Sequence, residues 1–340
     1  MKRLLPFAPL LLLAALLLSP AAALDGAKRG LDIWWGSVFP ALLPSFICVR
    51  LAQNLGLLRL WHSHPRTQLA AVMGFSLVSG APNGAKLLHA LVMEGTLSPR
   101  EGDRFLPLVN QVSPAFLLSI IASGLLKNKA LFLPMGGTFY GTTLILLIPQ
   151  MLRKCDAPAP LRSCETVPFS EAFAAAVGTS MLDMLCVGGC ILFVCTLLSL
   201  IRPIVPGEGA FAVLAGCMEV SVGASALARL DLPLRMKASL LMGFSAFGGL
   251  SLTLQTLCCY PALKLGSYLV KKLMLGALVG FFCYLVFPLF PGVSAAFATR
   301  QEVLSRSLSL SALALSSALS AAFMAVLSLM IGPKEKKRPF

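Results

Sequence analysis

Long apolar segments separated by short polar loops dominate this sequence, and they limit the folds open to it. A helix of roughly 20 apolar residues spans the hydrocarbon core of a bilayer. Segments of this kind lie at residues 4–24, 31–49, 106–126, 131–151, 170–201, 238–258, 273–292 and 309–332. Only 12% of the 340 residues are charged, whereas soluble globular proteins carry roughly a quarter. The sequence therefore predicts an all-α polytopic membrane protein with about eight transmembrane helices.

Two further apolar stretches are too short and too interrupted to span the bilayer comfortably. In residues 69–95, two short apolar arms are separated by SGAPNGAK, residues 79–86. Residues 208–228 are rich in Gly, Ala and Ser and carry Glu219 near the middle. Backbone groups freed by such breaks are tolerated at membrane depth only inside protein or beside a polar cavity. We predict two re-entrant hairpins; the alternative is a kinked helix whose polar groups satisfy one another.

The order of these elements divides the chain into two similar units. Sliding residues 74–119 onto 210–255 pairs Gly80 with Gly216, Asn83 with Glu219 and Ser113 with Gly249. Inverted repeats with broken helices are typical of secondary transporters. The predicted divisions are 1–28 (a signal-anchor-like transmembrane helix, alternatively a cleaved signal peptide), 29–151 (repeat 1, hairpin 69–95), 152–169 (a cytoplasmic loop), 170–292 (repeat 2, hairpin 208–228) and 293–340 (the last transmembrane helix and a basic tail).

Basic residues outnumber acidic residues by 28 to 14. Such an excess favours cytoplasmic loops that face anionic lipid. On this topology Arg50, Lys264, Lys271 and Lys272 lie in cytoplasmic loops, as does the basic tail. Nothing in the sequence resembles a nucleic-acid-binding module. The expected partners are therefore a small anionic substrate and anionic lipid, and a homo-oligomer stays open.

Polar residues gather where the predicted spans are broken, in LVNQVSPAF (108–116) and GFSAFGGLSLTLQT (243–256). The N-terminus of a half-helix carries a partial positive charge that favours anions. Together with the hairpins, these breaks predict a substrate site made of Asn83, Gly84, Lys86, Asn110, Gln111, Ser113, Glu219, Ser245, Ser251 and Gln255. Asp183 and Glu219 are the candidates for proton or ion coupling, because an acid inside the membrane is costly without a role.

Eight of the ten cysteines lie within apolar runs, and Cys155 and Cys164 lie in a polar loop. We expect the eight to pack as buried apolar residues, since no histidine or carboxylate cluster accompanies them at zinc spacing. No nucleophile, base and orienting group are recognisably combined. The sequence therefore predicts neither an enzyme, nor a metal site, nor a cofactor.

The segment SGAPNGAKLLHALVMEGTLSPREGDRFLPLVNQVSPAF (79–116) resembles the YlbJ-like sporulation integral membrane proteins. The later GFSAFGGLSLTLQT (243–256) and the earlier GLDIWWGSVFPALLPSF (30–46) resemble elements of the same family, and the match covers about residues 25–290. The resemblance implies a gate-domain protein of the nucleoside-recognition group, similar in design to concentrative nucleoside transporters. It also implies a role in endospore formation and in moving dipicolinic acid across the outer forespore membrane.

The function expected from residues and resemblance together is secondary transport of a small anionic metabolite, with dipicolinate as substrate. Two alternatives stay open: a nucleoside or other small-metabolite permease of the same architecture, and a non-transporting sporulation membrane scaffold. In the scaffold, the polar breaks would serve only helix packing.

Overall fold

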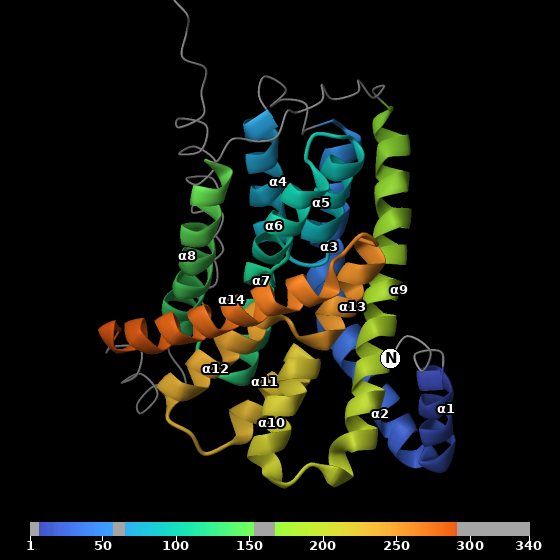
Figure 1. The fold of residues 1–340 in the computed structure, drawn as a ribbon, viewed down its shortest axis with the longest axis vertical. Helices are drawn as coiled ribbons and strands as arrows, with labels where there is room; N and C mark the ends of the chain where they lie inside the picture. Colours follow the sequence, from blue (N-terminus) through green and yellow to red (C-terminus); the bar gives the residue numbers. More distant parts are fainter. Residues whose placement is uncertain (1–6, 57–64, 153–166, 291–340) are drawn as a thin grey trace, which may run out of the picture.

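The computed structural model describes residues 7–56, 65–152 and 167–290, and every regular element within these ranges is a helix (Figure 1). The first part contains α1 (Ala8–Leu18), α2 (Pro20–Ile33), the π-helix η2 (Trp34–Val38), α3 (Phe39–Asn54), α4 (Pro65–Ser79), α5 (Asn83–Met93), α6 (Pro99–Val109), α7 (Pro114–Phe116), the π-helix η4 (Leu117–Leu125), the 3-10 helix η5 (Lys129–Leu131) and α8 (Phe132–Met151). The second part contains α9 (Phe169–Ile201), the 3-10 helix η6 (Arg202–Ile204), α10 (Gly207–Met218), α11 (Val220–Arg229), α12 (Leu234–Phe247), α13 (Gly249–Cys259), α14 (Leu265–Val286) and the 3-10 helix η7 (Phe287–Leu289).

Among the described residues, six helical segments are long and apolar enough to cross a membrane. They are Pro20–Asn54, Pro99–Leu125, Lys129–Met151, Phe169–Ile204, Leu234–Cys259 and Leu265–Leu289. Each overlaps one of the spans predicted from the sequence. The all-helical membrane architecture is thereby confirmed, while the predicted span at 309–332 lies outside the described residues, as does most of the loop at 152–169.

The N-terminal segment differs from its prediction. One continuous helix was expected over residues 4–24, but α1 ends at Leu18 and α2 begins at Pro20, with Ser19 between them. Proline lacks the N–H that an uninterrupted helix needs, and it is well suited to the first position of a new helix. At 11 residues, α1 is too short to span, and α2 leads directly through η2 into α3.

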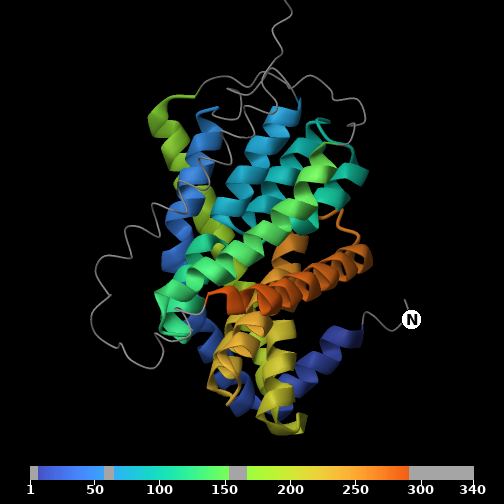
Figure 2. The same cartoon turned by 90° about the vertical axis from the view of Figure 1, so that its left-hand side faces the viewer.

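Both short stretches form helical hairpins, and these lie toward opposite ends of the molecule (Figure 1). Helices α4 and α5 occupy one end and α10 and α11 the other, and the view turned by 90° shows the same arrangement (Figure 2). In each hairpin the break between the arms faces the middle of the molecule. The middle is therefore where irregular backbone from the two hairpins can meet.

The helical run α2–η2–α3 packs along α9. The indole Nε1 of Trp34 donates a 3.0 Å hydrogen bond to the carbonyl oxygen of Met184, and Nδ2 of Asn54 donates a 2.9 Å hydrogen bond to the carbonyl oxygen of Ala172. Val38, Leu42 and Phe46 continue the same buried face. Helix α14 instead crosses the long axis of the molecule, as both ribbon views show (Figures 1 and 2). The main apolar core includes α14 residues such as Leu275 and Val279.

Candidate functional site

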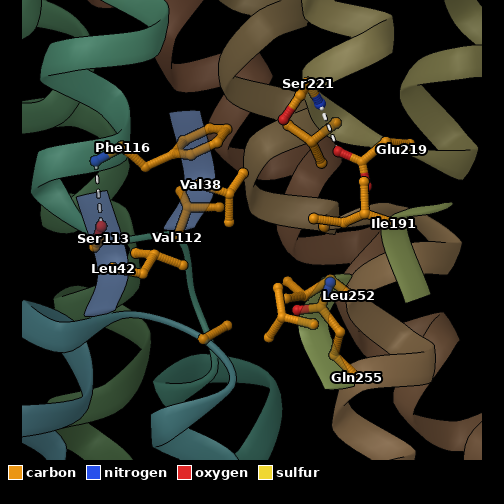
Figure 3. Close-up of a pocket in the computed structure, with 14 residues that line it drawn as sticks. Val38, Leu42, Val112, Ser113, Phe116, Ile191, Glu219, Ser221, Leu252 and Gln255 are labelled. Atoms are coloured by element: carbon orange, nitrogen blue, oxygen red, sulfur yellow. Dashed lines mark hydrogen bonds between the residues drawn. The ribbon is translucent and has the colours of Figure 1, made fainter. Parts of the chain in front are cut away.

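A small cavity lies where four helix breaks meet (Figure 3). It is lined by Val38, Leu42, Ala81, Val112, Ser113, Phe116, Val187, Ile191, Glu219, Val220, Ser221, Gly248, Leu252 and Gln255. Ala81 comes from the α4–α5 turn, Ser113 from the α6–α7 break, Glu219 from the α10–α11 tip and Gly248 from the α12–α13 break. Its volume is about 60 Å³.

At three of the four breaks, the two half-helices contribute unequally to this cavity. The lining includes residues that start the second half-helix of three breaks, such as Phe116, Val220 and Leu252. No residue of the first halves α4, α6, α10 and α12 lines it. N-terminal helix ends point unpaired N–H groups outward and carry partial positive charge. The backbone around the cavity is therefore rich in donors.

Glycine allows the breaks to approach one another. Gly80 has a φ of 78°, and a Cβ added there would lie 2.8 Å from both the Cβ and the N of Ser113. Its neighbour Ala81 donates a 2.7 Å backbone hydrogen bond to the carbonyl of Gln111. The SGAPNGAK turn is thus docked directly on the break between α6 and α7, and this contact brings Ala81 and Ser113 to one cavity.

Three predicted residues line the cavity, and each has a local hydrogen bond. Glu219 is 5% exposed, and its Oε1 accepts a 2.9 Å hydrogen bond from the backbone N of Ser221 (Figure 3). Ser113 Oγ accepts from the backbone N of Phe116 at 3.2 Å. Gln255 Nε2 donates to Ser251 Oγ at 3.3 Å. Glu219 is the charged side chain of the lining, and no basic side chain is among the residues that form it.

Apolar residues form the rest of the wall. Val38 and Leu42 come from η2 and α3, and Val187 and Ile191 come from α9. Figure 3 shows Val38, Leu42 and Phe116 on one side of the cavity, with Ile191 and Glu219 on the other. The cavity therefore combines a hydrophobic wall with a few polar groups, a composition common in small-molecule sites.

Lys272 is buried in a helix, although the predicted topology placed it in a loop. It was expected in a cytoplasmic loop, as was Lys271, but both lie within α14, and Lys272 is only 1% exposed. Its Nζ donates to the carbonyl oxygen of Asn110 at 3.1 Å and to Oε1 of Gln111 at 3.3 Å. A charged residue between two apolar runs looks interfacial in a sequence, and only the packing of α14 across α6 reveals its burial.

Asn110 and Gln111 therefore lie behind the cavity rather than in its wall. Asn110 Nδ2 donates to Thr256 Oγ1 at 2.7 Å and to the hydroxyl of Tyr268 at 3.1 Å. Gln111 Nε2 donates to the carbonyl oxygen of Pro107 at 2.7 Å. The Gln111 side chain thus pairs with a carbonyl near the end of α6, and the Asn110 side chain connects that end to α13 and α14.

Lys86 was predicted to contact substrate, but it is held in an ion-pair cluster outside the cavity lining. Its Nζ pairs with Asp183 Oδ1, and the guanidinium of Arg50 lies 3.4 Å from Asp183 Oδ2. Arg50, predicted in a loop, belongs to α3, so the cluster joins α3, α5 and α9. The coupling candidate Asp183 is thus neutralised by two cations, because an unpaired carboxylate would be costly there.

Four other predicted residues do not line the cavity. Gly84 packs on α6, where a Cβ would lie 2.6 Å from the carbonyl oxygen of Val109. Asn83 is 2% exposed, and its Nδ2 has no partner among the described atoms. Ser245 is fully buried with an unpartnered hydroxyl, and the hydroxyl of Ser251 accepts a hydrogen bond from the lining residue Gln255. Of the lining residues that were missed, Ser221 had a sequence signal: it is two residues after Glu219, where a carboxylate can cap a helix.

The burial of the cysteines differs from the prediction that all eight in apolar runs are buried. Cys195 and Cys283 are buried, but Cys48, Cys186, Cys217 and Cys258 are exposed on helix surfaces. The Sγ atoms of Cys186, Cys190 and Cys258 lie within 4.8 Å of one another, where α9 contacts α13. These three thiols form a cluster without a histidine or carboxylate among the described residues. Cys155 and Cys164 lie outside the described residues.

Comparison with known proteins supports the family resemblance that the sequence motifs predict. The chain is similar to the sporulation integral membrane protein YlbJ of Bacillus subtilis (strain 168), with 27% identity over 70% of this chain and 71% of the relative. No family model matches the chain. No solved structure matches it. With six membrane-length apolar segments among its described residues, the chain is a multi-pass membrane protein similar to a sporulation membrane protein, which confirms the YlbJ-like resemblance predicted from its motifs.

Proposed function

We propose that this protein is a secondary transporter of a small anionic metabolite, and that the central cavity is its substrate site. The observation that carries the proposal is the meeting of four helix breaks at one cavity. Irregular backbone at membrane depth is tolerated where it lines a cavity, and discontinuous helices at mid-membrane form the substrate sites of many transporters. Helix packing alone gives no reason for four breaks to converge.

The two halves of the chain support an inverted-repeat design for this transporter. In the first half the hairpin contacts the broken helix through Gly80 and Ser113. In the second half the hairpin contacts the broken helix through Met218 and Gly249, where a Cβ on Gly249 would lie 3.0 Å from the carbonyl oxygen of Met218. The alignment that pairs Gly80 with Gly216 also pairs Ser113 with Gly249. Ser113 and Gly249 are therefore equivalent in the proposed repeats, while Met218 aligns with Pro82, two residues after Gly80 in the first hairpin turn.

The preference for an anion rests on the helix ends. Helices α11 and α13 begin at the cavity, and α5 begins two residues after the lining residue Ala81. Their N-termini favour negative charge. The resemblance to YlbJ-like proteins implies dipicolinate, an aromatic dianion, and the apolar wall formed by Leu42, Phe116 and Ile191 suits an aromatic ring. Lys86 adds to this attraction only if it leaves Asp183.

Glu219 determines how an anion can enter. Its carboxylate already accepts the Ser221 N–H at the start of α11, so it occupies the position that a substrate carboxylate would take. Two carboxylates cannot both be charged at one donor group without strong repulsion. Entry of the substrate therefore requires protonation of Glu219, which makes Glu219 the proposed proton-coupling residue.

The cavity must also widen during transport. Pockets for ligands of this kind are on the order of 300 Å³ or more, whereas this cavity is about 60 Å³. That space suits a few water molecules. The conformation described here therefore corresponds to a closed state in the proposed cycle.

In a sporulating bacterium, the outer forespore membrane is the proposed location, with the basic loops facing anionic lipid. A permease for nucleosides or another neutral metabolite is the second candidate. The amide of Gln255 and the lack of a basic side chain in the described lining favour it, because neutral substrates are recognised by hydrogen bonds rather than charge.

Purified protein in liposomes tests the transport proposal. Labelled dipicolinate should accumulate saturably when a proton gradient is imposed, and unlabelled dipicolinate should compete. Uptake of a labelled nucleoside that dipicolinate does not inhibit would establish the second candidate instead. If correctly inserted protein moves neither compound under either gradient direction, the transport proposal is wrong and a scaffold role remains.

A further inference from the structure

Lys272 is a buried cation that the proposed transport step does not use. It lies in the interior of α14 and is 1% exposed. Among the described residues, its hydrogen-bond acceptors are the carbonyl oxygen of Asn110 and Oε1 of Gln111. Among the described residues, the acids that form ion pairs are Asp25, Asp103, Asp183 and Glu208, and none of them pairs with Lys272. A lysine at membrane depth without an acidic partner is expensive, and such residues are by default functional.

The position of its ammonium group explains what balances the charge. Asn110 is the C-terminal cap of α6, and a helix C-terminus carries partial negative charge on unpaired carbonyl groups. The fully buried Asn110 also has a side-chain Oδ1 without a donor. Two oxygen atoms from adjacent residues, Asn110 O and Gln111 Oε1, thus contact the ammonium at this break, and Oδ1 of the same Asn110 has no donor.

Such a group of oxygens is the usual environment of a bound cation. In transporters with broken helices, unwound carbonyls and half-helix C-terminal ends coordinate Na⁺, and amide and carbonyl oxygens are the ligands that hard cations prefer. Here an ammonium held on α14 occupies that environment. The neighbouring groups from the packed elements are neutral: Tyr268 from α14 and Thr256 from α13, both bonded to Asn110.

We propose that the Lys272 ammonium is a built-in substitute for a coupling metal cation at the C-terminal end of α6. This proposal rests on the proposed transporter function, and it specifies that transport does not require Na⁺. It also predicts that removing the charge converts the Asn110–Gln111 oxygens into a monovalent-cation site. A lysine that only filled space would leave no such site.

Thermal unfolding of purified protein in NaCl and in choline chloride of equal concentration tests the cation site without using transport. The melting temperature of the wild type should be the same in both salts. Lys272→Met keeps most of the length of the side chain but removes its charge, so the variant should melt several degrees lower in choline chloride. It should regain stability in NaCl, because a ligand that binds only the folded state stabilises it. Lys272→Arg, which retains a cation, should show no response to Na⁺.

Lys271→Met is the matched control, since Lys271 is the adjacent residue and its Nζ binds only the carbonyl oxygen of Asp103. It should not respond to Na⁺. Specific stabilisation of the wild type by Na⁺ would overturn the proposal, as would a Lys272→Met protein as stable as wild type in choline chloride. If Lys272→Met does not accumulate, Lys272→Gln is measured in its place.

Uptake in the same two salts separates this inference from the transport proposal. Wild-type uptake should be equal in NaCl and choline chloride, whereas uptake by Lys272→Met should be lost in choline chloride and partly restored by NaCl. Wild-type uptake that requires Na⁺ would refute the built-in cation while leaving transport intact. Absence of any wild-type uptake would refute the transport function, and the unfolding experiment would still decide the cation site.

Discussion

Gly249 packs against the carbonyl oxygen of Met218, so closely that a Cβ on Gly249 would lie 3.0 Å from that oxygen. Met218 ends α10 at the hairpin tip, and Gly249 begins α13 after the helix break. The backbone of Gly249 also has a φ of 70°, which L-residues rarely adopt. Both the contact and the conformation therefore require glycine, and together they join the hairpin tip to the broken helix.

Substitution of Gly249 should weaken the contact between the hairpin tip and the broken helix. Gly249→Ala should destabilise the protein by about 1–2 kcal/mol from backbone strain alone, with a further loss from displacement of the tip. Thermal unfolding in detergent and uptake in liposomes measure the two effects. Gly137→Ala is the control, because Gly137 lies in α8 with no atom near its potential Cβ. Equal melting temperatures and equal uptake in the two variants would contradict the role of the contact between Gly249 and Met218.

The cluster of Arg50, Lys86 and Asp183 predicts an unequal response to loss of its charges. Asp183→Asn should cost about 3 kcal/mol, the lower end for a buried pair because both cations are partly exposed. Lys86→Gln should cost only about 1 kcal/mol, since Arg50 still pairs with Asp183. Denaturant titration of the two single variants and the double variant measures the coupling. Loss of uptake in a fully stable Lys86→Gln protein would instead return Lys86 to the substrate site.

Glu219→Gln should remove the pH dependence of transport. In the wild type, substrate entry needs a protonated Glu219, so uptake should rise as the pH falls. Glutamine cannot titrate, and uptake by the variant should change little with pH and should carry no proton. Glu208→Gln is the control, because Glu208 is exposed at the start of α10. A wild-type pH profile in Glu219→Gln would exclude Glu219 as the coupling residue.

Opposite orientation of the repeats predicts opposite accessibility of their loops. Arg100 follows the first hairpin and Asp231 follows the second, and both side chains are exposed. In a protein without its native cysteines, Arg100→Cys should react with an impermeant maleimide from the cytoplasmic side and Asp231→Cys from the other side. Labelling of both positions from one side would refute the inverted layout.

The features that could be predicted from the sequence depend on local signals. Apolar length indicated the six described spans, and Gly80, Pro82, Pro114 and Gly248 marked breaks because these residues punctuate helices wherever they occur. The break at Pro20 had the same signal, but the apolar character of residues 4–24 outweighed it in the prediction. Ser113, Glu219 and Gln255 were identified because polar residues beside a break usually face a cavity.

The features that could not be predicted depend on packing between distant segments. The burial of Lys272 arises from the crossing of α14 over the end of α6, more than 150 residues away in the chain, and no periodicity encodes that crossing. The apolar wall from Val38, Leu42, Val187 and Ile191 is equally a product of how α3 meets α9. Lys86 had the chemistry of an anion site, yet its partner Asp183 could be recognised only in three dimensions.

Helix α9 has 33 residues and is therefore about 50 Å long, well beyond the roughly 30 Å hydrocarbon core of a bilayer. It contains no proline, and it carries Asp183 of the ion-pair cluster and Val187 and Ile191 of the cavity wall. Because this uninterrupted helix contacts both the ion-pair cluster and the cavity wall, it can serve as a fixed reference for measuring movement of the other elements. Spin labels near its two ends would keep a constant separation during turnover, and a third label on either hairpin would then report that hairpin's travel directly.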